Sequence, residues 1–295
     1  MTPKITTSWH VMAKSINDTS LIIAMPIESF VYPTNENGNC FICGNESEFK
    51  YDNTIITNQL KNAWGLSDKL VTAFNCKESM FCSNCGGSLR IRRLAEVIIQ
   101  TWAELSGARY LSIVQLMADP GFKGLSIAEV NRCGALHDYL QSHPGLHYSE
   151  YIEGVPPGQQ KNMIRCEDLQ RLTYPDNYFD IVITSETLEH VPDYDLAFRE
   201  IHRVLKEGGY HIFTVPVIPS QEKTAVRARL TREGIEHILS PAYHGAWLEE
   251  GMFVYTDFGM DIIPLLNEMR LTTDVYYYHP GDDNNVAIVF RSQNK

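Results

Sequence analysis

Four cysteines in the amino-terminal third of the chain have the spacing of a metal site. Cys40 and Cys43 form one Cys-x-x-Cys pair, Cys82 and Cys85 form a second, and a glycine follows each pair. Two residues between the thiolates let both reach one tetrahedral ion, and the glycine permits the tight turn. The pattern predicts a closed, structural zinc site, with buried free thiols as the alternative. Cys76 is an alternative ligand.

Histidines in the second half of the chain are candidates for acid–base chemistry. His190 follows a predicted buried strand, and an imidazole with its ordinary pKa near neutrality can take a proton from a hydroxyl or an amine. His237, Tyr243 and His244 form a later group that could bind an acceptor, supply the base or hold a second metal. A structural role stays open for all of them, because such side chains also satisfy the backbone of irregular loops.

A run of alternating strands and helices between Leu125 and Pro216 must position these groups. Strands are predicted at Leu125–Val130, Leu146–Tyr151, Met163–Leu169, Tyr178–Glu186 and Tyr210–Pro216, and helices at Ala135–Ser142 and Tyr194–Leu205. This alternation predicts parallel βαβ units, in which ligands bind beyond the carboxyl ends of the strands. Acidic residues stand at four of those ends: Glu129, Glu150, Asp168 and Glu186.

Two consecutive motifs in this run carry a family resemblance. The sequence FDIVITSETLEHVPD from Phe179, followed by FREIHRVLKEGG from Phe198, resembles the class I S-adenosylmethionine-dependent methyltransferases of the type 11 group. The resemblance covers Ser126 to Val217 well and the remainder loosely. It implies an α/β fold with a Rossmann-like, seven-stranded class I methyltransferase sheet, S-adenosyl-L-methionine as cofactor, and methyl transfer as the reaction.

The resemblance also implies roles for individual residues. Glu150 would bond both ribose hydroxyls, since a carboxylate has two accepting oxygens. Asp168 would meet the adenine amino group, Glu129 would hold the methionine end or brace the turn, and Ser185 would line the methionine pocket. Further residues expected around the cofactor are Asn131, Gly134, Tyr151, Glu167 and Leu169. Residues expected at the acceptor are Glu186, Arg229 and Tyr243, with His190, His237 and His244 as candidate catalytic groups.

The turn after the first strand departs from the family pattern. The family has a glycine-rich turn, whereas this chain has Glu129-Val-Asn131-Arg-Cys133-Gly134. Glycine permits positive φ and a close backbone approach to a ligand, and asparagine tolerates the same left-handed geometry. A usable turn is therefore still predicted.

The composition restricts the class of partner. The 295 residues include 25 basic and 36 acidic side chains, a net charge of −11, which argues against a nucleic-acid or anionic membrane surface. No apolar run has the length of a membrane span, and residues 1–16 lack the apolar block of a signal peptide, so a cytoplasmic location is expected. Oligomeric state cannot be inferred.

The expected domain division is an amino-terminal segment with a zinc ribbon at 1–87 and a methyltransferase domain at 88–295. A helix is predicted at Ser88–Leu105, with Arg90, Arg92 and Arg93 on a solvated face. Strands and a loop are expected at Glu48–Phe81. Near the carboxyl terminus we expect a helix at Asp257–Met269 and a hairpin of strands Thr272–Tyr278 and Val286–Arg291.

These features predict a methyltransferase that acts on a hydroxyl or an amine of a small-molecule acceptor, such as a sugar or a natural-product intermediate. Two alternatives remain. One is an RNA methyltransferase whose ribbon binds RNA, because some ribosomal RNA methyltransferases carry a four-cysteine site before the same core. The other is a non-catalytic protein with this fold that serves as an interaction module.

Overall fold

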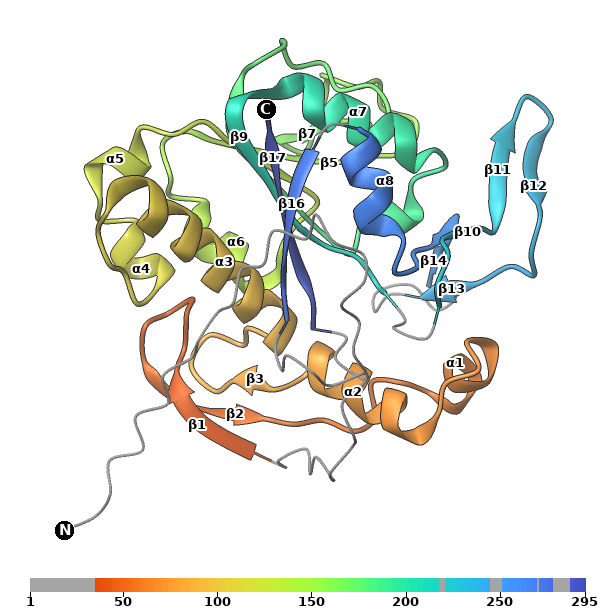
Figure 1. Cartoon of the computed structure of the whole chain (residues 1–295), viewed down its shortest axis with the longest axis horizontal. Helices are drawn as coiled ribbons and strands as arrows, with labels where there is room; N and C mark the ends of the chain where they lie inside the picture. Colours follow the sequence, from red (N-terminus) through yellow and green to blue (C-terminus); the bar gives the residue numbers. More distant parts are fainter. Residues whose placement is uncertain (1–34, 218–220, 245–250, 270, 278–286) are drawn as a thin grey trace.

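The computed structural model describes residues 35–217, 221–244, 251–269, 271–277 and 287–295. Its centre is an eight-stranded sheet of order β16-β17-β9-β8-β4-β5-β7-β6 (Figure 1). The strands are β4 (Ile127–Val130), β5 (Leu146–Glu150), β6 (Gln160–Lys161), β7 (Ile164–Cys166), β8 (Phe179–Ser185), β9 (Leu205–Thr214), β16 (Leu271–Tyr276) and β17 (Val289–Asn294). Strands β7, β5, β4, β8 and β9 run parallel, and β17, β16 and β6 pair antiparallel. The predicted Rossmann-like fold is confirmed, with β6 as an additional edge strand.

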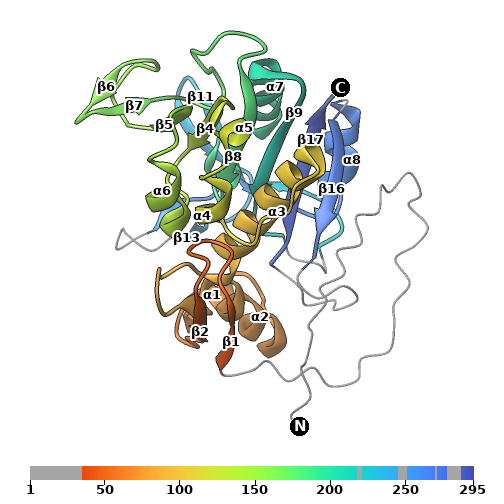
Figure 2. The same ribbon diagram turned by 90° about the vertical axis from the view of Figure 1, so that its left-hand side faces the viewer.

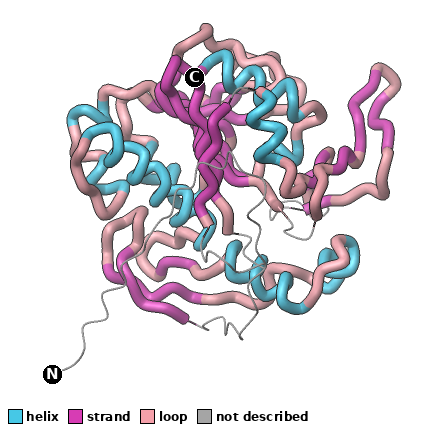
Figure 3. Tube along the Cα trace, in the orientation of Figure 1, coloured by secondary structure: helices cyan, strands magenta, loops and turns pink. Residues whose placement is uncertain are grey.

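Helices cover both faces of this sheet, as Figures 1 and 3 show. One face carries α3 (Leu89–Ser106), α4 (Ile113–Leu116), α5 (Pro120–Lys123) and α6 (Gly134–Leu140), and the other carries α7 (Tyr194–Val204) and α8 (Ile262–Glu268). Successive residues of a strand point to opposite faces. Accordingly, Ile181 and Ile183 of β8 join the apolar cluster of α3, whereas Val182 joins that of α7. Burial on both faces explains the continuous apolar run in this strand.

The amino-terminal part of the described chain is a small three-stranded antiparallel sheet with two helices. The strands are β1 (Asn35–Asn39), β2 (Glu46–Lys50) and β3 (Phe81–Cys82), and the helices are α1 (Asn58–Ala63) and α2 (Asp68–Glu78). The expectation of strands and a loop throughout this region was wrong, because both helices have side-chain caps. Thr57 accepts a hydrogen bond from the Leu60 amide, and Ser67 accepts one from Leu70. The unit lies below α3 in Figure 2.

Helix α3 joins this unit to the large sheet. Ser88 caps its start and Gly107 ends it in the left-handed region at φ 71°, as the sequence predicts. One apolar cluster contains Cys40 and Ile42 from the small unit together with Leu94 of α3. The same cluster includes residues of strands β4, β8 and β9, so the two units share one continuous core.

The basic cluster at the start of α3 does not lie on a solvated face, so that expectation was wrong. Arg92 is 5% exposed, and its guanidinium lies 3.6 Å from the centre of the Phe49 ring. Arg93 is 7% exposed and forms an ion pair with Glu96. A charge run near the junction of two packed units finds partners on both of them, and sequence spacing alone does not reveal this.

The carboxyl-terminal helix is shorter than predicted. It begins at Ile262, because Thr256–Asp257 forms a strand, β15, paired with β10 (Ala225–Val226). The expected antiparallel pairing of β16 with β17 is present, and the connection between these two strands lies outside the described residues. A hairpin of β11 (Ala228–Thr231) and β12 (Gly234–His237) projects from the body in Figure 1, near the pair β13 (Tyr243–His244) and β14 (Met252–Phe253). None of the described helices is long and apolar enough to cross a bilayer.

Candidate functional site

The two Cys-x-x-Cys pairs fold into matching turns. The Cys40–Cys43 pair lies between β1 and β2, and the Cys82–Cys85 pair begins at the end of β3. In each turn the amide of the following glycine donates to the carbonyl of the first cysteine at 2.8 Å, and that glycine has a φ of 72–75°. Left-handed geometry at this position favours glycine, which explains why Gly44 and Gly86 follow the pairs.

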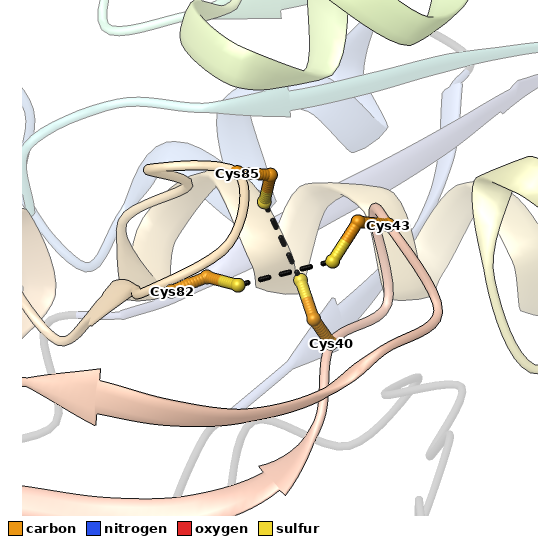
Figure 4. A group of neighbouring side chains, drawn as sticks. All are labelled: Cys40, Cys43, Cys82 and Cys85. Atoms are coloured by element: carbon orange, nitrogen blue, oxygen red, sulfur yellow. Dashed lines mark hydrogen bonds between the residues drawn. The ribbon is translucent and has the colours of Figure 1, made fainter.

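The four sulfur atoms form a compact group, drawn in Figure 4. Cys40 Sγ lies 3.7 Å from Cys85 Sγ, and Cys43 Sγ lies 3.8 Å from Cys82 Sγ. Four sulfurs at about 2.3 Å from a tetrahedral zinc ion are about 3.8 Å apart, so the spacing fits that ion. Cys76, the alternative ligand, is buried in α2 and is not part of the group.

The turn after β4 has the left-handed geometry that the sequence allows. Asn131 has φ 64°, and its side-chain oxygen accepts from the Tyr151 amide at 3.4 Å. Gly134 has φ 49° and begins α6. Glu129 is fully buried, and its two oxygens contact the Cys133 amide at 2.8 Å and His137 Nδ1 at 2.7 Å. Both oxygens of Glu129 are thus engaged by the turn and by α6.

The ends of β5 and β7 hold the residues expected around a nucleoside. Glu150 is half-buried and accepts a hydrogen bond from Tyr148 through one oxygen. Asp168 accepts from the amide and the side chain of Gln170, and Leu169 beside it is buried. Glu167 is fully buried and bonded internally: it accepts from the Thr173 amide and pairs with Arg165. Of the residues expected at this edge, Glu150, Asp168 and the exposed Tyr151 are accessible to a ligand.

Charged residues of α2 and α3 reach the carboxyl end of β8, which sequence reasoning missed. Arg90 of α3 donates to Ser185 Oγ at 2.6 Å and forms a bidentate pair with Glu78 of α2. Lys77 is 1% exposed and donates to Glu186 at 2.8 Å. Glu186 has a positive φ of 49°, so its strained backbone is held at this contact. No motif marks these pairs, because their members are far apart in sequence.

The electrostatics of this network depend on burial and pairing together. Burial alone would raise the pKa of the Glu78 carboxyl, but Arg90 and Lys77 outweigh it and lower the pKa to about 2. Burial also works against the charged form of Arg90, yet Glu78 and Glu186 raise the pKa of this guanidinium above its ordinary value. The network is therefore a set of matched charges at the edge of the sheet.

A second group of titratable side chains lies just beyond this charge network. The short 3-10 helix η1 (Leu188–His190) follows β8 and brings Glu189 and His190 next to His244 of β13. The rings of His190 and His244 are 4.7 Å apart, and His190 Nδ1 contacts the Phe253 carbonyl at 2.8 Å. Burial lowers the pKa of both imidazoles, that of His244 to about 3, with the His190 charge adding to the effect. Burial and the Glu186 charge raise the pKa of Glu189.

A small cavity of about 110 Å³ opens at this group. It lies beyond β8 and β9 and is lined by Trp64, Glu189, Pro216, Gln221, Arg227, His244, Val254, Thr256, Asp257 and Phe258. Trp64 comes from the amino-terminal unit and meets His244 edge-on at 5.3 Å. The amino-terminal unit therefore covers this part of the sheet edge in addition to bracing the core.

The remaining predicted residues lie apart from the cavity. Arg229 is exposed on β11, whereas its neighbour Arg227 lines the cavity and pairs with Asp257. Tyr243 and His237 are exposed and contact the Phe253 ring at 5.4 and 5.5 Å. The structure thus brings His190 and His244 together and leaves His237 outside their group.

Comparison with known proteins supports the predicted class. Residues 145–213 match a family model described as a methyltransferase domain. A ubiquinone biosynthesis O-methyltransferase from Pseudomonas aeruginosa is 28% identical over 247 residues, which cover 78% of this chain and 85% of the relative. A demethylmenaquinone methyltransferase from Staphylococcus carnosus is 37% identical over 82 residues, and the match spans 25% of this chain and only 34% of that relative.

A solved S-adenosylmethionine-dependent methyltransferase from Mesorhizobium loti aligns with 61% of this chain and 96% of its own at 19% identity, with a TM-score of 0.40. The domain match and the relatives support the prediction of a class I S-adenosylmethionine-dependent methyltransferase.

Proposed function

We propose that the chain transfers the methyl group of S-adenosyl-L-methionine to a hydroxyl group of a small-molecule acceptor, with an amine as the second choice. The cavity beyond β8 and β9, which Glu189 and His244 line, carries this proposal, because ligands of such sheets bind beyond the carboxyl ends of the strands. The ubiquinone biosynthesis O-methyltransferase that matches most of the chain favours oxygen as the methylated atom.

The residues around the first turn fit this cofactor. Asn131 adopts the left-handed geometry that the turn requires, and Gly134 adds no side chain at the start of α6. Glu150 has a second oxygen without a hydrogen bond from the described residues and would accept from a ribose hydroxyl. Arg90, beside Ser185, would bind the carboxylate of the methionine part. When bound, the cofactor supplies an electrophilic methyl group on a sulfonium.

The acceptor would lose its proton beside η1. Burial lowers the pKa of both imidazoles, which keeps His190 and His244 neutral near neutral pH and leaves one unprotonated nitrogen on each ring to accept the proton, although the lower pKa also makes each ring a weaker base. Trp64 and Phe258 give the lining of the cavity an apolar part. Arg227 and Asp257 supply polar groups that would orient an acceptor.

The four-cysteine group would hold a structural zinc ion. Its sulfur spacing fits zinc, and four thiolates leave no coordination position for a substrate. The ion would fix the two turns against α3 and thereby position Glu78 and Trp64 over the sheet edge.

No observation favours the RNA alternative. The basic side chains at the start of α3 are paired inside the protein and do not form a basic surface. We therefore propose a small-molecule acceptor with no nucleic-acid or membrane partner.

The first test is thermal unfolding of the purified protein with and without S-adenosylhomocysteine. The second is an activity assay that measures the S-adenosylhomocysteine formed from S-adenosylmethionine when phenols, sugars or amines are offered as acceptors. A ligand at about 100 times its Kd stabilises the native state by about 2.7 kcal/mol. We expect this shift in the wild type and in the exposed-site control Glu153→Gln, and its loss in Glu150→Ala. A folded protein that shows no shift would refute the proposal.

A further inference from the structure

Three metal-ligating side chains converge at η1 although the sequence separates them. Glu189 and His190 are adjacent in the chain, while His244 comes from β13. One ligand atom from each lies within 4.8 Å of the others. His190 Nε2 is 3.6 Å from Glu189 Oε1. Ligand atoms about 2.1 Å from a tetrahedral ion are about 3.4 Å apart, so the Glu189–His190 pair already has the required spacing.

Glu189 is a buried carboxylate that the surrounding protein leaves unmatched. It is 1% exposed, and neither of its oxygens meets a hydrogen-bond donor among the described residues. The two nearby cations have other partners: Lys77 pairs with Glu186, and Arg90 pairs with Glu78. A buried carboxylate without a partner is costly, and a cation placed between it and the imidazoles would remove that cost.

The imidazole of His190 is oriented as a ligand would be. Its Nδ1 lies 2.8 Å from the Phe253 carbonyl, so this nitrogen carries the proton and Nε2 presents its lone pair to Glu189. The Tyr255 amide donates to the Glu189 carbonyl at 2.8 Å and fixes the backbone of η1. On the other side, Trp64 packs edge-on against His244 and limits its movement.

We propose that Glu189, Nε2 of His190 and the imidazole of His244 bind one divalent first-row transition-metal ion, separate from the four-cysteine group. Two imidazole nitrogens and one carboxylate oxygen suit zinc, iron(II), cobalt(II) and manganese(II), and three protein ligands leave at least one position open. Glu189 and His244 line the cavity, so that position faces the proposed acceptor site.

The ion would define the acceptor more closely, a step that rests on the proposed function. An acceptor hydroxyl that takes the open position would lose its proton to solvent more readily, because the metal would stabilise the oxyanion, and the two imidazoles would then be ligands and not the base. The same ligand position discriminates against a protonated amine, which has no lone pair to donate. The expected acceptor is therefore a phenol or alcohol whose oxygen coordinates the ion.

The experiment uses the full chain. The protein is dialysed against a chelator, the zinc that remains bound is measured, and cobalt(II) is then added as the probe. We expect one further equivalent of cobalt to bind, with visible d–d bands and without a thiolate charge-transfer band. His244→Ala and Glu189→Gln should each weaken this binding at least tenfold. His237→Ala is the matched control, since this exposed histidine on β12 lies outside the group.

Absence of cobalt binding in the folded protein, or equal binding in wild type, His244→Ala and Glu189→Gln, would overturn the proposal. Glu189→Gln keeps the shape of the side chain, so it remains informative if His244→Ala does not fold. S-adenosylhomocysteine binding is measured on the same samples. If the protein binds S-adenosylhomocysteine but not cobalt, the metal site alone is refuted. If it binds cobalt but not S-adenosylhomocysteine, the proposed function alone is refuted.

Discussion

Replacing Glu78 with glutamine tests the charge network that joins the amino-terminal unit to the sheet edge. The pKa of Glu78 is lowered from an ordinary 4.5 to about 2, against the effect of burial, by Arg90 and Lys77. One pKa unit corresponds to about 1.4 kcal/mol, so the shift stabilises the native state by about 3 kcal/mol at neutral pH. Solvent reaches 23% of the side chain, which moves the expectation to about 2–3 kcal/mol.

The pH dependence has a definite sign. The folded-state pKa is lowered, so the stabilisation is complete above the unfolded-state value near 4.5 and is lost as the pH falls towards 2. Urea unfolding of Glu78→Gln, followed by circular dichroism at pH 7 with zinc present, should therefore show the full loss. The exposed-site variant Glu153→Gln should stay within about 0.5 kcal/mol of wild type.

A double-mutant cycle with Arg90→Met assigns the loss to the ion pair. Glu78 and Arg90 are in bidentate contact at 2.9–3.1 Å, so the double variant should cost at least about 1 kcal/mol less than the sum of the single variants. Additive costs, or a Glu78→Gln variant as stable as Glu153→Gln, would refute the assignment of this network as a stabilising junction.

Three further perturbations test other parts of the structure. Chelation of the metal, or Cys43→Ser, should lower the Tm by at least about 10 °C in calorimetry, because a structural zinc ion contributes directly to folding, and an unchanged Tm would argue for free thiols. Glu129→Gln should cost about 1–3 kcal/mol in urea unfolding, since the turn loses its charged acceptor beside His137. Arg92→Met should cost about 1–2 kcal/mol through loss of the contact with Phe49, and a cost below 0.5 kcal/mol would contradict that contact.

The sequence by itself determined the local elements and the parts of the site that depend on them. The apolar run Phe179–Ser185 predicts a buried strand because both faces of β8 are covered, and Ser88 and Gly107 predict the ends of α3 through capping. The cysteine pairs predict their turns because each needs only four residues and a glycine. Strand-end placement of Glu150 and Asp168 follows from the same βαβ pattern.

Only the tertiary structure decided which charges meet. Lys77 and Glu186 are 109 residues apart, and Arg90 and Ser185 are 95 apart, so no local periodicity could pair them. The basic residues of α3 looked solvated because spacing shows which residues share a helix face but does not show what packs on it. His190 and His244 likewise meet because η1 and β13 fold over one cavity, whereas His237, equally plausible in sequence, stays exposed. Side-chain convergence depends on how elements pack, and packing is a property of the whole chain.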